Sequence, residues 1–197
     1  MNVLVDRFPT SVEIDGKSYE LNTDFRTCLK IILAFEDNDL CAAEKYAVML
    51  NNLYKELPKN TKKAVVEAIK FLDKGNSSDE QETPIRLFSY NQDADFIFAA
   101  FRQTHGIDLE ISEMHWWKFV TLFMDIGSDT VFSNLVSLRK RIKTGRATKE
   151  ERKLARELGD MFELEKIDNR TIKEKEAERI FLEKVARSKE LEYASKK

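Results

Sequence analysis

The sequence predicts a mainly α-helical protein: a single helical domain with an N-terminal β-hairpin and a charged C-terminal helix. Apolar residues recur at helical spacing along most of the chain, 35% of the residues are charged, and the 197 residues include only 6 Gly and 3 Pro. A charge content above the usual value of about 25% favours long, solvated helices. We expect residues 1–158 to form the helical core domain and residues 159–197 to form a charged helical extension.

The N-terminal residues 3–21 predict a β-hairpin. Apolar and polar residues alternate on both sides of Asp15-Gly16, a dipeptide suited to a tight turn with positive φ. An isolated hairpin is marginal in water, so this one should lie against the helices.

Three helices should follow the hairpin. The pattern predicts a helix over residues 24–35 capped by Thr23, a second starting at Asp39, and a third starting at Thr61. In the third helix, the apolar side is expected to carry Val65, Ile69 and Leu72. Residues 75–84 are small, polar and acidic and end in Pro, which predicts an exposed loop within one domain.

The sequence predicts that the fold is organised around residues 93–123, which hold both histidines and both tryptophans. This stretch predicts two helices, the first capped by Asp93 and ended by Gly106, the second capped by Ser112 with Glu113 in its first turn. The second helix is apolar almost all round, which is typical of a helix at the centre of a core.

The last part of the chain predicts further helices. One covers residues 130–142, and capping boxes that begin at Thr148 and Thr171 should open two more. Gly159 should end the helix that carries Leu154 and Leu158.

Several motifs of the central stretch resemble one small protein family. They are Tyr90, Asp93, residues 95–101, residues 105–109 (HGIDL) and above all His115-Trp116-Trp117-Lys118-Phe119. The chain is similar, from its N-terminus to about Leu158, to phage and prophage proteins of low-GC Gram-positive (Firmicutes) hosts, the phage "Gp fifteen" family. These proteins are encoded close to the tail tape-measure gene and are generally regarded as tail-assembly chaperones.

The resemblance implies a function and its partners. Such a protein would bind the helical tape-measure protein non-covalently, as an apolar helix in a groove, and would help recruit tail-tube subunits. It would work in the host bacterial cytoplasm, and a homo-oligomer is possible. Two alternatives remain: a structural tail or head-completion protein retained in the virion, and a nucleic-acid-binding regulatory protein.

The residues to test for partner binding are also the best core candidates. They are aromatic residues and one lysine: Trp116, Trp117, Lys118 and Phe119, with Phe96 and Phe101 behind them. If these residues form the core, the binding surface lies elsewhere, on the C-terminal helix or on the basic run.

The basic run consists of Arg139, Lys140, Arg141, Lys143 and Arg146. Such a strip could contact phosphates or an acidic partner helix, or it could be solvated at a helix C-terminus, where the helix dipole favours cations. The run lacks interleaved aromatic residues and the net charge is −2. A solvated or protein-facing strip is therefore favoured over a nucleic-acid site.

The sequence points to no enzymatic chemistry. It has no Gly-rich phosphate loop, no closely spaced Cys or His pairs for zinc and no nucleophile elbow. We therefore predict no catalytic residue, no cofactor and no metal. Cys28 and Cys41 are expected to remain thiols, and His115 to be a packed residue bonded to backbone. No apolar run approaches the roughly 20 residues that span a bilayer, and no signal peptide is expected.

Overall fold

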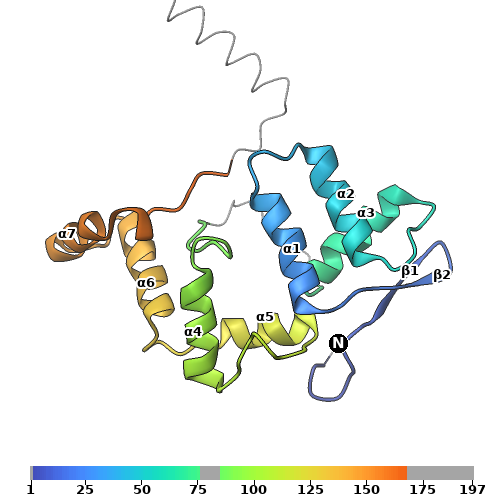
Figure 1. Ribbon diagram of the computed structural model, residues 1–197, viewed down its shortest axis with the longest axis horizontal. Helices are drawn as coiled ribbons and strands as arrows, with labels where there is room; N and C mark the ends of the chain where they lie inside the picture. The colour runs from blue at the N-terminus through green and yellow to red at the C-terminus, as the bar shows by residue number, and fades with distance from the viewer. Residues whose placement is uncertain (1, 76–84, 168–197) are drawn as a thin grey trace, which may run out of the picture.

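The computed structural model describes residues 2–75 and 85–167, which form a mainly helical fold with an N-terminal β-hairpin (Figure 1). The predicted fold class is confirmed. The described residues contain β1 (Ser11–Ile14), β2 (Lys17–Glu20), α1 (Phe25–Glu36), α2 (Ala42–Leu53), α3 (Thr61–Leu72), α4 (Ala94–His105), α5 (Trp116–Met124), α6 (Val131–Lys143), α7 (Lys149–Leu158) and a 3₁₀ turn, η1 (Gly159–Met161). Most of the predicted 75–84 loop and the helix predicted from Thr171 onward lie outside the described residues.

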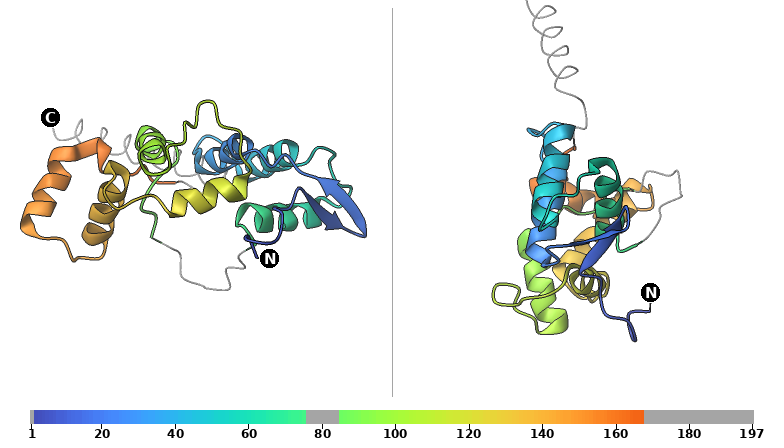
Figure 2. Two further views of the ribbon diagram at one scale, coloured as in Figure 1. Left: turned by 90° about the horizontal axis from the view of Figure 1, so that it is seen from below. Right: turned by 90° about the vertical axis from the view of Figure 1, so that its right-hand side faces the viewer.

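The helices follow one another along an elongated molecule. α6 and α7 lie at one end, the hairpin and α3 lie at the other, and α1, α4 and α5 lie between them (Figures 1 and 2). α5 crosses the lower side of this central part and touches both α1 and α4. No helix in the described ranges is both long and apolar enough to cross a membrane.

The hairpin forms as the alternating pattern predicts. β1 and β2 pair antiparallel, and Asp15 and Gly16 turn the chain with φ values of 51° and 76°. Ile14 and Tyr19 are buried, and the Tyr19 ring meets the Tyr54 ring edge-on at 6.5 Å. The hairpin therefore lies against the helices through its apolar residues, as expected of a sheet too small to be stable alone.

Two of the three predicted helix starts are wrong by one to three residues. α1 is capped by Asp24 and not by Thr23, since the Asp24 carboxylate accepts from the Arg26 amide. α2 begins after Cys41, whose amide donates to Glu44, and not at Asp39. The start of α3 at Thr61 is correct, but its cap is Asn60. When several neighbouring residues could each cap a helix, their spacing in the sequence alone does not show which of them does.

The buried side of α3 includes Leu72 and, in part, Val65 as predicted, but it differs from the prediction at its other positions. Ala64, Ala68, Phe71 and Leu72 are buried, whereas Ile69 is exposed. The Tyr54 hydroxyl donates to the Ala64 carbonyl at 2.8 Å, which holds the alanine side of the helix inward. Small residues such as Ala64 and Ala68 allow neighbouring helices to pack closely. The stripe of larger apolar residues that includes Ile69 therefore did not mark the buried side of this helix.

The start of α5 is corrected as well. His115 caps this helix, and Ser112 does not, because the Ser112 hydroxyl donates to the Asp108 carbonyl within a preceding turn. Residues on either side of His115 pair with the chain before α1: the Phe25 amide donates to the Met114 carbonyl, and the Trp116 amide donates to the Thr23 carbonyl. This long-range pairing keeps the chain extended until Trp116.

Candidate functional site

The aromatic residues of the His-Trp-Trp-Lys-Phe motif lie in the core. Trp116 and Trp117 are buried, and their indole N–H groups donate to the Leu72 and Phe71 carbonyls at 2.9 and 2.8 Å. These two carbonyls belong to the C-terminal end of α3, where backbone acceptors lack partners within the helix. The two tryptophans therefore join α5 to α3 by packing and by capping at once.

Phe119 is at the centre of this aromatic core. Its ring is stacked between the Phe25 ring at 5.0 Å and the Phe101 ring at 4.9 Å, so α1, α4 and α5 meet there. Phe101 is fully buried and Phe96 is partly buried against the same cluster. Lys118 is exposed. Of the candidate binding residues, Lys118 alone lies mainly at the surface.

His115 is bonded to backbone on both ring nitrogens. Its Nδ1 accepts from the Trp117 amide at 3.0 Å, so Nε2 carries the proton and donates to the Pro9 carbonyl at 2.9 Å. Burial lowers the pKa of His115, and the Pro9 carbonyl opposes that shift. A neutral histidine therefore serves as the N-cap of α5 and fixes the chain before the hairpin. The other histidine, His105, bonds the Leu122 carbonyl at 2.9 Å.

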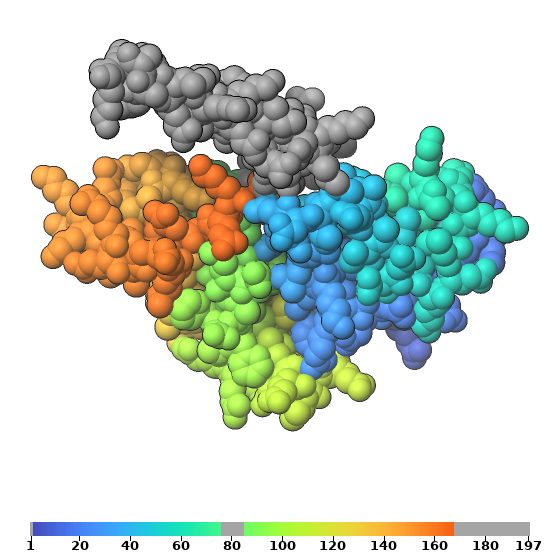
Figure 3. All heavy atoms as spheres, turned by 45° about the horizontal axis from the view of Figure 1, so that its top comes forward, coloured from blue at the N-terminus to red at the C-terminus, as the bar shows by residue number. Residues whose placement is uncertain are grey.

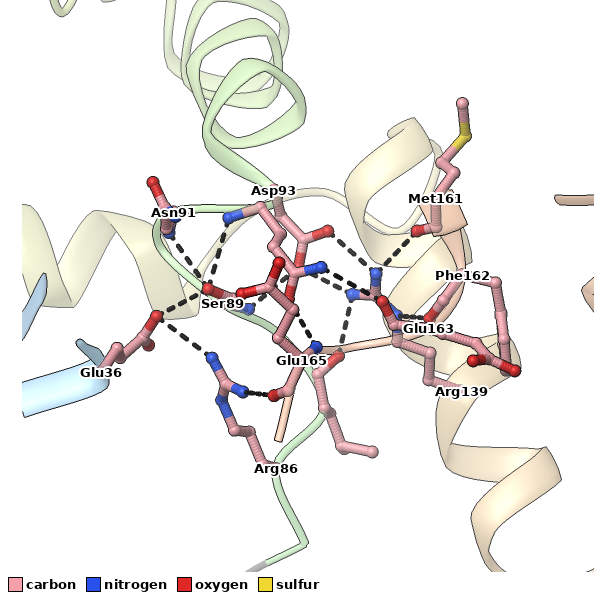
Figure 4. Close-up of polar contacts among 12 residues, drawn as sticks. Glu36, Arg86, Ser89, Asn91, Asp93, Arg139, Met161, Phe162, Glu163 and Glu165 are labelled. Carbon is pink, nitrogen blue, oxygen red and sulfur yellow. Dashed lines mark hydrogen bonds and ion pairs between the residues drawn. The ribbon is translucent and has the colours of Figure 1, made fainter. Parts of the chain in front are cut away.

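The predicted basic strip is not a continuous solvated surface, because Arg139 is buried. It forms a bidentate ion pair with Asp93, with N–O distances of 2.7 and 3.0 Å, and the side chains of both residues are only 1% exposed (Figure 4). Asp93 was predicted to cap α4, but its carboxylate makes no such bond. Asp93 therefore stands at the N-cap position of α4 as predicted, but its carboxylate binds Arg139 instead of the first-turn amides, and Arg139 is not part of a solvated strip.

All five N–H groups of the Arg139 guanidinium have acceptors. Besides Asp93, they donate to the carbonyls of Leu87 at 3.2 Å, Phe162 at 2.8 Å and Met161 at 2.9 Å. A buried charge is tolerated only when it is paired and fully hydrogen-bonded. Arg139 thereby holds together α4, the chain before α4 and the chain after α7. We call Asp93 and Arg139 the clamp pair.

The other residues of the basic strip are exposed but engaged to different degrees. Arg141 pairs with Glu151 of α7 at 2.7 Å. Lys143 donates to the Arg86 carbonyl at 2.6 Å, and burial together with Arg139 and Arg86 lowers its pKa. Lys140 and Arg146 are also at the surface.

A polar network extends from the clamp pair to α1. Asp93 accepts from the Ser89 amide at 3.0 Å, and the Ser89 hydroxyl donates to Glu36 at 2.6 Å (Figure 4). Glu36 also pairs with Arg86 at 3.1 Å. Sequence reasoning missed this network. One signal could have found Arg139: with Phe132 and Leu135 it follows the i, i+3, i+7 spacing of the buried face of α6.

The chain after α7 makes the turn η1 and then returns across the molecule; we call residues 161–167, which begin at the end of this turn, the strap. Figure 3 shows it at the surface between α6–α7 and α1–α2. Near Asn38 the strap lines a pocket of about 490 Å³, together with the end of α1 and the loop that follows it. The polar residues that line this pocket include Glu36, Asp37 and Arg86. The apolar residues that line it include Leu33 and Ile167.

Comparison with protein families then identifies the chain. Residues 4–164 match the family described as Bacteriophage Gp15 protein. The chain belongs to this family. The match covers every described helix from α1 to α7 and the first part of the strap. Searches of curated proteins and of solved structures returned no match.

Membership of the Gp15 family indicates a phage structural or morphogenesis protein. In residues 2–75 and 85–167, no group of three or more His, Cys, Asp or Glu side chains is placed to hold a metal ion. The main structural features in the described part of this family member are an aromatic core, a buried clamp pair and a strap held at the surface.

Proposed function

We propose that this Gp15-family protein is a tail-assembly chaperone that binds the phage tape-measure protein and helps recruit tail-tube subunits. The observation that carries the proposal is the family match over residues 4–164. The mechanism would be non-covalent, without catalysis or a cofactor, and would operate in the host bacterial cytoplasm.

The burial of the tryptophan motif bears on where a partner could bind. Because Trp116, Trp117 and Phe119 are committed to the core, a tape-measure helix would need another apolar surface. α7 offers one: Leu154 is 46% exposed, and Leu158, four residues later on the same side, is partly exposed. Only Ala155 of this helix is buried.

The charge around this surface favours one kind of partner. Because Arg139 is buried, the count runs over residues 140–153, which contain seven Lys or Arg against two Glu. An amphipathic tape-measure helix with acidic residues beside its apolar stripe would complement both features. We propose that such a helix packs against Leu154 and Leu158.

Co-expression with the tape-measure protein of the same phage tests the proposal. A tagged pull-down with light scattering should give a soluble complex, while tape-measure protein expressed alone should aggregate. Leu154→Glu should weaken this complex about tenfold or more, since it places a charge in the apolar contact. Leu57→Glu is a matched control, because Leu57 is 50% exposed and precedes α3 at the other end of the molecule.

Other outcomes would favour the alternatives. No soluble complex, together with retention of this chain in purified virions, would favour a structural tail or head-completion protein. DNA binding that falls steeply with salt would favour a regulatory role. Equal loss of binding in both leucine variants would argue against a site on α7.

A further inference from the structure

Among the described residues, the hydrogen bonds between the strap and the rest of the molecule all use the strap's main chain, and its side chains Phe162, Leu164 and Ile167 are partly buried. Arg139 binds the carbonyls of Met161 and Phe162, as described above, and four more hydrogen bonds continue the row. Gln92 donates to the Glu163 carbonyl at 3.2 Å and accepts from the Glu165 amide at 2.9 Å. Arg86 donates to the Glu165 carbonyl at 2.6 Å, and Asn38 donates to the Lys166 carbonyl at 3.0 Å.

This arrangement resembles the edge of a β-sheet, although neither of the two described strands lies beside the strap. The Gln92 side-chain amide meets the C=O of one residue and the N–H of the residue two positions later, as a neighbouring strand would. Side chains from three separate parts of the chain thus form a groove that binds an extended backbone. We call this row, formed by Asn38, Arg86, Gln92 and Arg139, the strap groove.

The strap groove needs an occupant. Without the strap, the Arg139 Nε and one Nη2 hydrogen would lose the Phe162 and Met161 carbonyls. An unmade hydrogen bond in a buried charged group is costly. A chain whose strap has detached is therefore expected to refill its groove.

The turn that leads into the strap carries the main conformational constraint. Gly159 has φ 52° and ψ −124°, a combination that L-residues rarely adopt, and open space surrounds the position of a Cβ atom. The turn at Gly159 reverses the chain between the end of α7 and the strap groove. Opening at Gly159 would release the strap while leaving the aromatic core intact.

We propose that the strap of a second copy of this chain can fill the strap groove, so that two copies exchange straps in a symmetric dimer. A second copy carries the same extended backbone and recovers the six hydrogen bonds in each groove. The exchange goes beyond tape-measure binding and does not depend on it. In the monomer the tether keeps the strap at an effective concentration on the order of millimolar, so exchange competes only when chains are concentrated or the turn is strained.

Gly159→Ala tests the proposal in the full chain. A Cβ at this φ and ψ strains the closed turn but not an opened one, so the dimer fraction by light scattering should rise roughly tenfold or more over wild type. Gly145→Ala is the matched control: Gly145 also has positive φ (73°) and open surroundings, but it joins α6 to α7. It should leave the chain monomeric.

Disulfide trapping identifies the contact and also tests the wild-type turn. In a Cys41→Ser background, Gln92→Cys is combined with Cys at position 163, 164 or 165, and the pair that closes fastest within one chain is chosen. Cys28 can remain, since it is fully buried and burial raises its pKa to about 12. The two halves of the pair are then placed in separate chains, which are mixed, unfolded and refolded at high concentration.

Disulfide-linked chain pairs from the mixed sample, enriched by Gly159→Ala, would support strap exchange. The proposal is overturned if Gly159→Ala remains monomeric with its strap closed in cis. It is also overturned if a dimer forms in which the chosen pair closes only within single chains, because the copies would then meet through another face. Loss of tape-measure binding in these variants would concern the proposed function alone.

Discussion

The aromatic core around α5 and the arm formed by α6 and α7 are stabilised in different ways. In the core, Trp116, Trp117 and Phe119 pack among aromatic rings from α1, α3 and α4. In the arm, Leu135, Leu138 and Ala155 are buried but do not belong to the main core cluster. The arm is joined to the core by Phe132, which belongs to the cluster, and by the clamp pair.

The difference matters because the two kinds of interaction respond differently to change. Apolar packing is lost in proportion to the volume removed. A buried ion pair is costly to break from one side, because the remaining charge has no partner. A small apolar cluster with a polar clamp is therefore a region where one substitution can release the arm while the aromatic core persists.

The largest effect is expected from breaking the clamp pair. Arg139→Met leaves Asp93 buried without its partner and should lower the free energy of unfolding by about 3–5 kcal/mol. Urea denaturation measures the change. Lys140→Met, on the exposed neighbour, should stay within about 0.5 kcal/mol of wild type. Adding Asp93→Leu to Arg139→Met should restore part of the loss, and no recovery would mean that the strap carbonyls, and not the buried charge, dominate the cost.

A smaller effect is expected in the aromatic core. Trp117→Phe keeps most of the ring packing but removes the N–H that donates to the Phe71 carbonyl. The Phe71 carbonyl still accepts from the Lys74 amide. The loss should be about 1–3 kcal/mol by urea denaturation, with the arm still docked by amide exchange. A loss of amide-exchange protection in α6 but not in the aromatic core would contradict the inference that the two regions are stabilised independently.

Gln92→Ala should affect the strap more than the whole molecule. It removes two hydrogen bonds to the strap backbone, each worth about 0.5–1.5 kcal/mol. Amide exchange at Glu165 should accelerate, while the midpoint of global unfolding changes little. Asn91→Ala is a nearby control, because only its backbone amide contributes a bond to the network. Equal acceleration in both variants would mean that the loop before α4, and not Gln92, holds the strap.

The smallest effect is a pH dependence from His115. Its pKa in the folded protein lies below the ordinary value of 6.5, first because of burial, so the unfolded chain binds the extra proton more readily. The stability contribution is complete above about pH 6.5 and falls as the pH drops from 6.5 through the folded pKa. His115→Asn keeps an N-cap oxygen without titrating in this range and should flatten this part of the stability curve. If the pH dependence of stability is unchanged in His115→Asn, that dependence comes from other titratable groups.

The sequence determined the regular elements and the place of the aromatic residues. The Asp15-Gly16 turn, the Gly106 helix end with φ 66° and the Thr148–Glu151 capping box all depend on neighbouring residues, and each forms as predicted. An all-round apolar helix such as α5 has only the core to occupy, so its burial also follows from sequence.

Only the tertiary structure decided the pairing of Asp93 with Arg139 and the use of His115 as the N-cap of α5. Asp93 and Arg139 are 46 positions apart, and each also fits a common local role, a helix cap or a solvated helix end. Local patterns favour those roles because they require no distant partner. The strap groove is less predictable still, since Asn38, Arg86, Gln92 and Arg139 bind backbone atoms whose positions depend on the fold of the whole chain.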